Sequence, residues 1–237
     1  MTGWRVGTVA ATHEETSTAR TIDLDVPGWG GNIAGQHVDL RLTAEDGYQA
    51  VRSYSLASSG SGERLQLAVD KLPDGEVSPY LVDDVMVGDQ LEIRGPLGGW
   101  FVWTPEMTDS VQLIAGGSGI VPLMAMIRSR RAVGSTAPFR LLYSVRNVDD
   151  AFFRSELETP SAGLEVTWLY TRQAPPGFPR PAGRISPADL AELTFPASVG
   201  PAVFVCGPTG FVEAVATALV GLGHDPARVK TERFGGA

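Results

Sequence analysis

A stretch near residue 50 combines side chains that a half-buried strand does not normally combine. Residues 50–59 read AVRSYSLASS, which places Arg52, Ser53, Tyr54 and Ser55 in direct succession. A strand with one face in a core should keep alternate positions apolar, and neither set of alternate positions does so here. The arginine offers a planar fork that suits a phosphate. The stretch therefore indicates a strand shaped around a ligand rather than around a core.

A second segment, residues 70–81 with the sequence DKLPDGEVSPYL, carries donors suited to the same kind of ligand. We predict a short helix here, with Ser78 as its N-cap and Pro79 as its first residue. Gly75 and Ser78 would then place backbone and hydroxyl donors at a helix N-terminus, which attracts anions. Together with Arg52 this favours a nucleotide-like ligand. A solvated arginine near a capped helix is the alternative interpretation.

A glycine-rich run, GGSGIVP at residues 116–122, lies between a predicted strand and a predicted helix. Glycines there allow a tight turn and let backbone N–H groups approach a phosphate. Pro122 replaces the third glycine of the dinucleotide motif G-x-G-x-x-G. Ile120 stands where the nucleophile-elbow motif G-x-S-x-G needs glycine. A purely structural turn is the alternative, but a place after the first strand of a parallel sheet favours a ligand site.

The cysteine at position 206 ends another predicted strand, within VFVCGPTGF at residues 203–211. A lone buried cysteine usually packs as a small hydrophobe, but Cys206 belongs to the same predicted sheet edge as the glycine run. It is the chain's one cysteine. This excludes an internal disulfide and a cysteine-held iron–sulfur cluster within the sequence, and it points to a reducing compartment.

Hydrophobic periodicity divides the chain into two halves, for which we expect domains at residues 1–104 and 105–237. The first half alternates with period two and has glycine-rich breaks, which predicts a small antiparallel barrel. Its six strands are predicted at 4–11, 18–26, 36–43, 49–57, 64–72 and 89–96. The second half alternates strands and helices, which predicts a doubly wound parallel sheet. Its strands are predicted at 110–117, 139–146, 164–172, 202–207 and 228–234, and its helices at 123–131, 150–158, 188–193 and 211–223.

Composition narrows the possible partners and the location. The net charge of −8 disfavours a general nucleic-acid binder. The three histidines, His13, His37 and His224, show no metal-ligand spacing, so we expect no metal site. The opening MTGWRVG has no apolar core of a signal peptide, and the longest uncharged stretch, 111–127, is short for a membrane span and contains glycines and a proline. We expect a soluble, cytoplasmic protein.

The motifs R-x-Y-S, G-x-V-S, G-G-S-G-I-V-P, C-G-P and a final TERFGG occur here in one order along the whole chain. In this arrangement the sequence closely resembles the ferredoxin–NADP reductase family, and more narrowly the compact flavin reductases that serve oxygenases. The resemblance implies FAD on the barrel and a nicotinamide dinucleotide on the α/β half. It implies that Arg52 binds the flavin pyrophosphate, that Tyr54 packs on the isoalloxazine ring and that Ser55 bonds near flavin N5.

The resemblance also assigns the remaining site residues. The FAD-binding residues would be Arg52, Ser53, Tyr54, Ser55, Val69, Asp70, Lys71, Gly75, Val77 and Ser78, with Phe234 covering the flavin ring. The nicotinamide dinucleotide would lie against Gly117, Ser118, Gly119, Pro122, Arg146, Thr171, Arg172, Cys206, Gly207 and Pro208. Ser55, Cys206 and Glu232 would be the catalytic residues. Plant-type members end at a tyrosine in the role of Phe234, whereas this chain continues through Gly235, Gly236 and Ala237.

The implied reaction moves hydride from the nicotinamide to the flavin and then passes electrons to a separate acceptor, such as a ferredoxin or an oxygenase component. NADP-using relatives carry a Ser-Arg pair for the 2′-phosphate where this chain has Thr171 and Arg172, with Arg146, Arg180 and Arg184 nearby in sequence, so we expect NADPH rather than NADH. A solvated Arg172 is the alternative. Two other functions stay open: a sensor module that binds flavin without turnover, and a scaffold with neither ligand.

Overall fold

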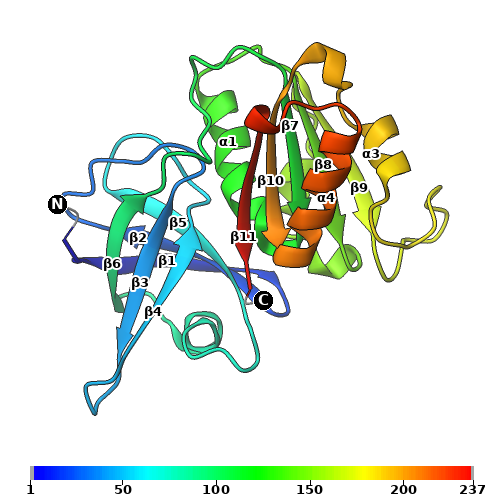
Figure 1. Cartoon of the computed structure of the whole chain (residues 1–237). Helices are drawn as coiled ribbons and strands as arrows, with labels where there is room; N and C mark the ends of the chain where they lie inside the picture. Colours follow the sequence, from blue (N-terminus) through cyan, green and yellow to red (C-terminus); the bar gives the residue numbers. More distant parts are fainter. Residues whose placement is uncertain (1–2, 236–237) are drawn as a thin grey trace. The chain divides into compact units, whose positions relative to one another are not determined.

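The computed structural model describes residues 3–235, and the chain divides into two compact units (Figure 1). The first unit comprises Met1–Thr104 with Met124–Ser129, and the second comprises Pro105–Leu123 with Arg130–Ala237. Within residues 3–235, every helix is too short or too polar to cross a membrane.

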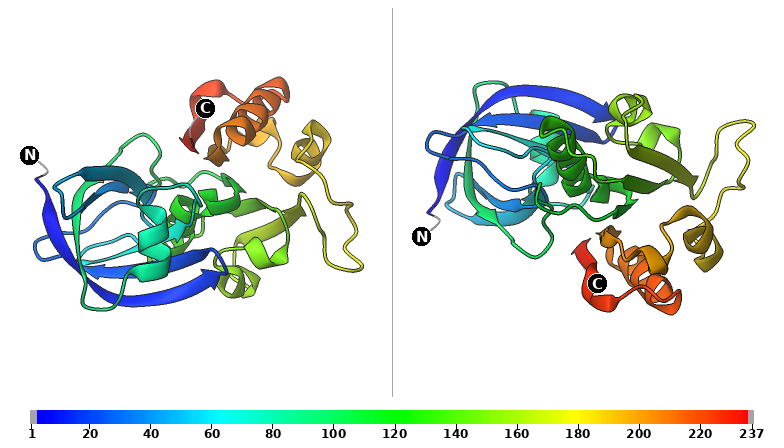
Figure 2. Two further views of the ribbon diagram at one scale, coloured as in Figure 1. Left: turned by 90° about the horizontal axis from the view of Figure 1, so that it is seen from below. Right: turned by 90° about the horizontal axis from the view of Figure 1, so that it is seen from above.

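The first unit is built on one six-stranded antiparallel sheet. Its strands are β1 (Arg5–Thr16), β2 (Ala19–Asp25), β3 (His37–Thr43), β4 (Gln49–Ser55), β5 (Arg64–Asp70) and β6 (Gln90–Leu97). They pair in the order β4-β3-β6-β1-β2-β5, and an isolated bridge between Leu56 and Leu67 joins the end of β4 to β5. The strands wrap around a common interior, which the views in Figure 2 display. The predicted barrel is confirmed.

Alternation along the strands builds this interior. Ile22, Leu24 and Val26 are fully buried, as are Val38 and Leu40 on β3. They belong to one apolar cluster with residues of β5 and β6. β4 differs, because it is an edge strand whose side chains are mostly exposed on both faces. The broken periodicity of residues 50–55 therefore reflects a strand that contributes little to the core.

The segment after β5 departs from its prediction. The expected helix is a five-residue π-helical turn, Tyr80–Asp84, which Pro79 precedes without a side-chain cap. Ser78 does not cap it, so that prediction was wrong. Its hydroxyl instead accepts a hydrogen bond from the backbone N–H of Leu72 at 3.0 Å. The chain doubles back here, with the Gly75 N–H donating to the Leu72 carbonyl at 2.9 Å, which brings the upstream amide within reach of the hydroxyl.

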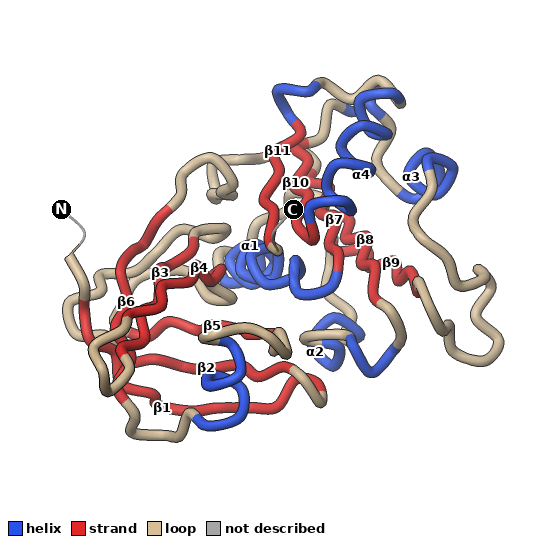
Figure 3. The backbone as a smooth tube through the Cα atoms, turned by 60° about the horizontal axis from the view of Figure 1, so that its bottom comes forward, coloured by secondary structure: helices blue, strands red, loops and turns tan. Residues whose placement is uncertain are grey.

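The second unit is built on a five-stranded parallel sheet, ordered β11-β10-β7-β8-β9. The strands are β7 (Val111–Gly116), β8 (Phe139–Val145), β9 (Leu164–Tyr170), β10 (Ala202–Pro208) and β11 (Val229–Phe234), and the helices are α1 (Ile120–Ala132), α2 (Arg154–Glu158), α3 (Pro187–Leu193) and α4 (Thr209–Gly221). α3 and α4 lie on one face of the sheet and α2 on the other (Figure 3). Helices on both faces of a parallel sheet confirm the predicted doubly wound class.

The start of α3 is fixed by a capping box. The Ser186 hydroxyl accepts from the backbone N–H of Asp189 at 3.2 Å, and the Asp189 carboxylate accepts from the Ser186 backbone N–H at 2.8 Å. Arg180 completes the arrangement by donating to both carboxylate oxygens, at 2.7 and 2.8 Å. Hydrogen bonding to the Arg180 guanidinium is the main reason that the pKa of Asp189 is lowered to about 2, and the Ser186 donors lower it further. The guanidinium thus anchors the loop before α3 to the helix.

We predict that Asp189→Asn lowers the free energy of unfolding at pH 7 by about 2 kcal/mol, which corresponds to the lowered pKa. A lowered pKa stabilises the fold only where the carboxyl is ionised in the unfolded chain. The difference between wild type and variant should therefore be complete above pH 5 and shrink as the pH falls from about 4 to 2. Urea unfolding across that range measures it. Glu192→Gln, an exposed carboxylate of the same helix, is the control, and an equal loss in both variants would contradict the assignment.

Candidate functional site

The carboxyl ends of β7 and β10 meet without room for side chains. A Cβ atom on Gly119 would lie 2.2 Å from the carbonyl oxygen of Cys206, and a Cβ atom on either Gly116 or Gly207 would lie 2.8 Å from Cδ1 of Phe211. Gly117 adopts a left-handed φ of 56°, which favours glycine. The structure thus brings the glycine run and the C-G-P segment together at one sheet edge, where parallel sheets bind their ligands.

The other residues predicted in these two segments occupy distinct positions. Ser118 lies in a 3-10 turn, Gly117–Gly119, and is partly buried. Pro122 is buried in the first turn of α1, where a missing N–H donor is tolerated. Pro208 is exposed at the end of β10, and it pairs in register with Phe234 of β11.

Cys206 and Glu232 are register partners on neighbouring parallel strands. Burial, and next the charge of Glu232, raise the pKa of the Cys206 thiol. The thiol is therefore protonated and a poor nucleophile. Burial also raises the pKa of Glu232 to about 7. The pair thus supplies one neutral sulfur and one carboxyl that changes charge near neutral pH.

Phe234 ends β11 and is 37% exposed. The Thr209 hydroxyl donates to the carbonyl of Gly235, with a distance of 3.4 Å. The continuation through Gly236 and Ala237 lies outside the described residues.

The predicted phosphate-binding cations lie at the carboxyl ends of β8 and β9. The Thr171 N–H donates to the Val145 carbonyl at 2.8 Å, and the Arg172 N–H donates to the Arg146 carbonyl at 2.9 Å. Both guanidiniums, of Arg146 and Arg172, belong to exposed residues. Arg180 is different, because its guanidinium is occupied by Asp189. The backbone therefore brings two accessible arginines side by side at this edge of the sheet.

On the barrel unit, Tyr54 and Ser53 already have intramolecular roles. Tyr54 packs against the apolar cluster, and burial raises its pKa to about 12. The Ser53 hydroxyl donates to Asp39 at 2.7 Å, and Asp39 also accepts from Arg94 at 2.6 Å. Arg52, on the same strand, forms an ion pair with Glu76. The arginine remains about half exposed, so a ligand can reach it.

Several predicted binding residues between Val69 and Ser78 have side chains that are buried or already bonded to other residues. Val69 and Val77 are buried in the core. The Asp70 carboxylate accepts from the Thr18 hydroxyl at 3.2 Å, and the Lys71 ammonium donates to Asp83 at 3.0 Å. A Cβ atom on Gly75 would lie 2.8 Å from the Ser78 hydroxyl oxygen. The close turn therefore requires glycine at this position.

Two residues that sequence reasoning missed lie beside the predicted set. His37 is the cross-strand partner of Ser55, so both side chains stand on the same face of the sheet. Burial lowers the pKa of His37, although the negative charge of Asp39 acts in the opposite direction. Pairing the predicted strands 36–43 and 49–57 as a hairpin would have placed this histidine opposite Ser55. No pattern in the sequence indicated that Glu76 would pair with Arg52.

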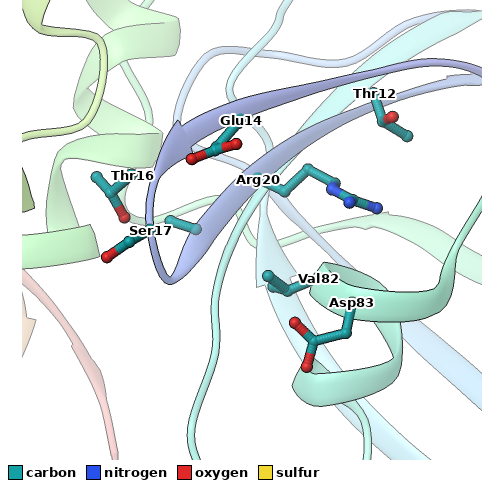
Figure 4. A pocket seen from close by; sticks show the side chains of 8 residues that line it. Thr12, Glu14, Thr16, Ser17, Arg20, Val82 and Asp83 are labelled. Carbon is teal, nitrogen blue, oxygen red and sulfur yellow. The ribbon is translucent and has the colours of Figure 1, made fainter.

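A surface cavity on the barrel has none of the predicted site residues in its lining (Figure 4). It is lined by Thr12, Glu14, Thr16, Ser17, Ala19, Arg20, Val82 and Asp83. Arg20 donates to the carbonyl of Val85 at 2.9 Å, and Asp83 accepts from Lys71. Its cation and one of its carboxylates are thus already engaged, and we assign it no function.

Comparison with known proteins matches both units. The family model described as an oxidoreductase FAD-binding domain matches residues 9–102, and the model described as an oxidoreductase NAD-binding domain matches residues 113–217. NADH-cytochrome b5 reductase 1 of Emericella nidulans is 32% identical over 82% of this chain and 65% of its own length. The ferredoxin reductase component of 3-ketosteroid-9-alpha-monooxygenase from Mycolicibacterium smegmatis is 34% identical over 95% of this chain and 64% of its own.

The fold agrees with these matches. The FAD/NAD-binding domain of nitric oxide dioxygenase from Vibrio cholerae superposes with a TM-score of 0.86 and 26% identity, covering all of both chains. The chain spans just under two thirds of the two curated relatives named above. With matching family models on both units, this chain belongs to the ferredoxin–NADP reductase family of FAD- and NAD(P)-binding oxidoreductases.

Proposed function

We propose that this chain oxidises NADPH at the second unit, uses FAD held by the barrel unit as its redox group, and passes electrons to a separate ferredoxin or oxygenase component. The observation that carries the proposal is the β7–β10 edge, where Gly119 and Cys206 approach as bare backbone beside a carboxyl of near-neutral pKa. When bound, FAD supplies two-electron acceptance from a reduced nicotinamide and one-electron release. The chain's own residues bind and orient these groups.

The barrel unit suits a flavin dinucleotide. Arg52 presents a half-exposed guanidinium on an edge strand, and a guanidinium binds pyrophosphate oxygens through charge-assisted bonds. Tyr54 is anchored by the core and offers a fixed aromatic face. Gly75 keeps the neighbouring turn tight. Because the helical turn after Ser78 is only five residues long, Arg52 rather than a helix dipole supplies most of the positive potential for the pyrophosphate.

The second unit suits a nicotinamide dinucleotide. Gly117 has open space where a Cβ atom would stand, so a ligand can approach the backbone there, and the neutral Cys206 thiol limits where a nicotinamide ring can lie. An ionised Glu232 stabilises the positive charge that a nicotinamide gains when it gives up hydride. Arg146 and Arg172, exposed at the neighbouring strand ends, suit the dianionic 2′-phosphate of NADPH. Ser55, with His37 opposite it, is proposed to hold a proton near the flavin.

The proposed electron acceptor, a ferredoxin or an oxygenase component, is inferred from the names of similar proteins. A relative from Ralstonia, 27% identical over 96% of this chain and 68% of its own length, is a ferredoxin–NAD(P)(+) reductase component of naphthalene 1,2-dioxygenase/salicylate 5-hydroxylase systems. The Mycolicibacterium relative is likewise a reductase, the ferredoxin reductase component of a monooxygenase. With one cysteine in 237 residues, this sequence cannot hold a cysteine-ligated cluster of its own. Electrons therefore leave to another protein, to another segment of a longer chain, or to a small oxidant.

We predict that the purified chain carries about one FAD and reduces ferricyanide with NADPH as donor. The flavin is released by heat and identified by chromatography, and NADPH oxidation is followed by absorbance. Bound FMN, or flavin without turnover with either nicotinamide, would contradict the proposal and favour a sensor module.

Arg172→Gln should lower kcat/KM for NADPH about ten- to a hundredfold, because it removes a charge-assisted phosphate contact. NADH turnover should change by less than twofold. Steady-state kinetics with both cofactors measure the difference. Arg131→Gln, an arginine paired with Glu156, is the control. Equal losses with NADPH and NADH would remove Arg172 from the 2′-phosphate site.

The rate of flavin reduction by NADPH should rise as the pH increases through about 7, because Glu232 ionises there. Glu232→Gln should keep the low-pH rate and lose the rise. Stopped-flow reduction from pH 5.5 to 8.5 records both profiles. Glu213→Gln, which removes an exposed carboxylate paired with Arg233, should preserve the wild-type profile. A rise that persists in Glu232→Gln would assign the titration to another group.

A further inference from the structure

The guanidinium proposed to bind the FAD pyrophosphate already holds an anion of the chain itself. NH2 of Arg52 pairs with Oε2 of Glu76, and NH1 donates to the carbonyl of Val51 at 2.8 Å. The other carboxylate oxygen, Oε1, accepts from the Tyr48 hydroxyl at 2.9 Å. Hydrogen bonding to Glu76 also raises the pKa of Tyr48. Two donors, the Tyr48 hydroxyl and the Arg52 guanidinium, thus converge on the carboxylate of Glu76.

Charge in this group has a direct consequence for an anionic ligand. Arg52 and Glu76 together carry no formal net charge, whereas Arg52 alone would carry one positive charge. A carboxylate bonded to the same guanidinium repels a pyrophosphate and uses N–H donors that the pyrophosphate needs. Both side chains are about half exposed, at 52% and 47%. An exposed ion pair of this kind is weak, so a dianionic ligand can break it at a small cost.

We propose that Glu76 is an internal competitor of FAD for Arg52, so that it sets the FAD affinity below what Arg52 alone would give. This rests on the proposed role of Arg52 at the pyrophosphate. The Tyr48 hydroxyl gives the displaced carboxylate a second partner, which keeps it close to the site. The FAD of this chain is consequently more readily exchanged than in a site with an unopposed arginine.

Three observations indicate that Glu76 competes with a ligand for Arg52 and does not mainly stabilise the fold. Glu76 stands at the x of the motif G-x-V-S, next to Val77, which is buried and anchors the turn. The carboxylate itself lies at the surface and is not part of the core. Arg94 offers a contrast, because its carboxylate partner Asp39 is only 12% exposed and is also held by Ser53. The Arg52 pair lacks that burial, so it is the one a ligand can displace.

The test is FAD release from the full-length flavoprotein on dilution, followed by the fluorescence of free FAD. Glu76→Gln should lower the dissociation constant about three- to tenfold. It should also make that constant more salt-dependent, because the site gains net positive charge. Asp74→Asn removes an exposed carboxylate two residues away and should leave both properties unchanged. A dissociation constant for Glu76→Gln that is unchanged or higher, or an equal effect of Asp74→Asn, would overturn the proposal.

Arg52→Gln separates this proposal from the one on which it rests. If Arg52→Gln leaves the dissociation constant unchanged, Arg52 does not bind FAD and both proposals fail. If Arg52→Gln weakens binding but Glu76→Gln does not tighten it, the competition alone fails. In the double variant the gain from Glu76→Gln should fall to less than half of its value in wild type. A gain that persists in full would mean simple charge repulsion and would overturn competition for Arg52.

Discussion

No side chain fits where β7 and β10 end, and the second unit depends on that constraint. The carbonyl of Cys206 would lie 2.2 Å from a Cβ atom on Gly119, so the turn before α1 and the end of β10 can approach only as bare backbone. Phe211 closes the same space from the first turn of α4 by packing on Gly116 and Gly207. Any residue larger than glycine at these positions would separate the strand ends. Backbone therefore meets backbone at this edge, and the Phe211 ring covers the faces of Gly116 and Gly207.

This packing also sets the electrostatics of the edge. β11 pairs with β10 in a register that puts Glu232 beside Cys206. Burial, rather than any cation, raises the pKa of Glu232 to about 7, and burial also raises the pKa of the Cys206 thiol. A carboxyl at the same place on an exposed strand would stay ionised. Glu232 is thus a group that titrates near neutral pH because of its burial and not because of a charged partner.

Periodicity predicted the strands and helices well because each depends on neighbouring residues. The β7–β10 edge was also predictable, since glycines after a buried strand leave few alternatives. The hydrogen-bond and ion-pair partners of individual side chains were not predictable from the sequence. Ser78 is an ordinary N-cap residue, yet its hydroxyl bonds upstream to Leu72. Arg180 resembles a phosphate ligand in sequence, but Asp189, nine residues later, occupies its fork. Local sequence fixes what a side chain can bond to, whereas the tertiary fold decides which partner is within reach.

The two carboxylates of Glu232 and Glu76 show how burial determines what a carboxylate can do in this chain. Glu232 is partly buried on the edge strand β11, so its pKa is raised to about 7 and its protonation state responds to pH near neutrality. Glu76 lies at the surface between Arg52 and Tyr48, so its charge is available to compete for the same guanidinium as a phosphate. Exchanging their environments would exchange these properties. A buried Glu76 would be locked to Arg52 and would block the anion site, because breaking a buried ion pair is far more costly than breaking an exposed one. An exposed site is therefore what allows an arginine to serve an internal carboxylate and a ligand in turn.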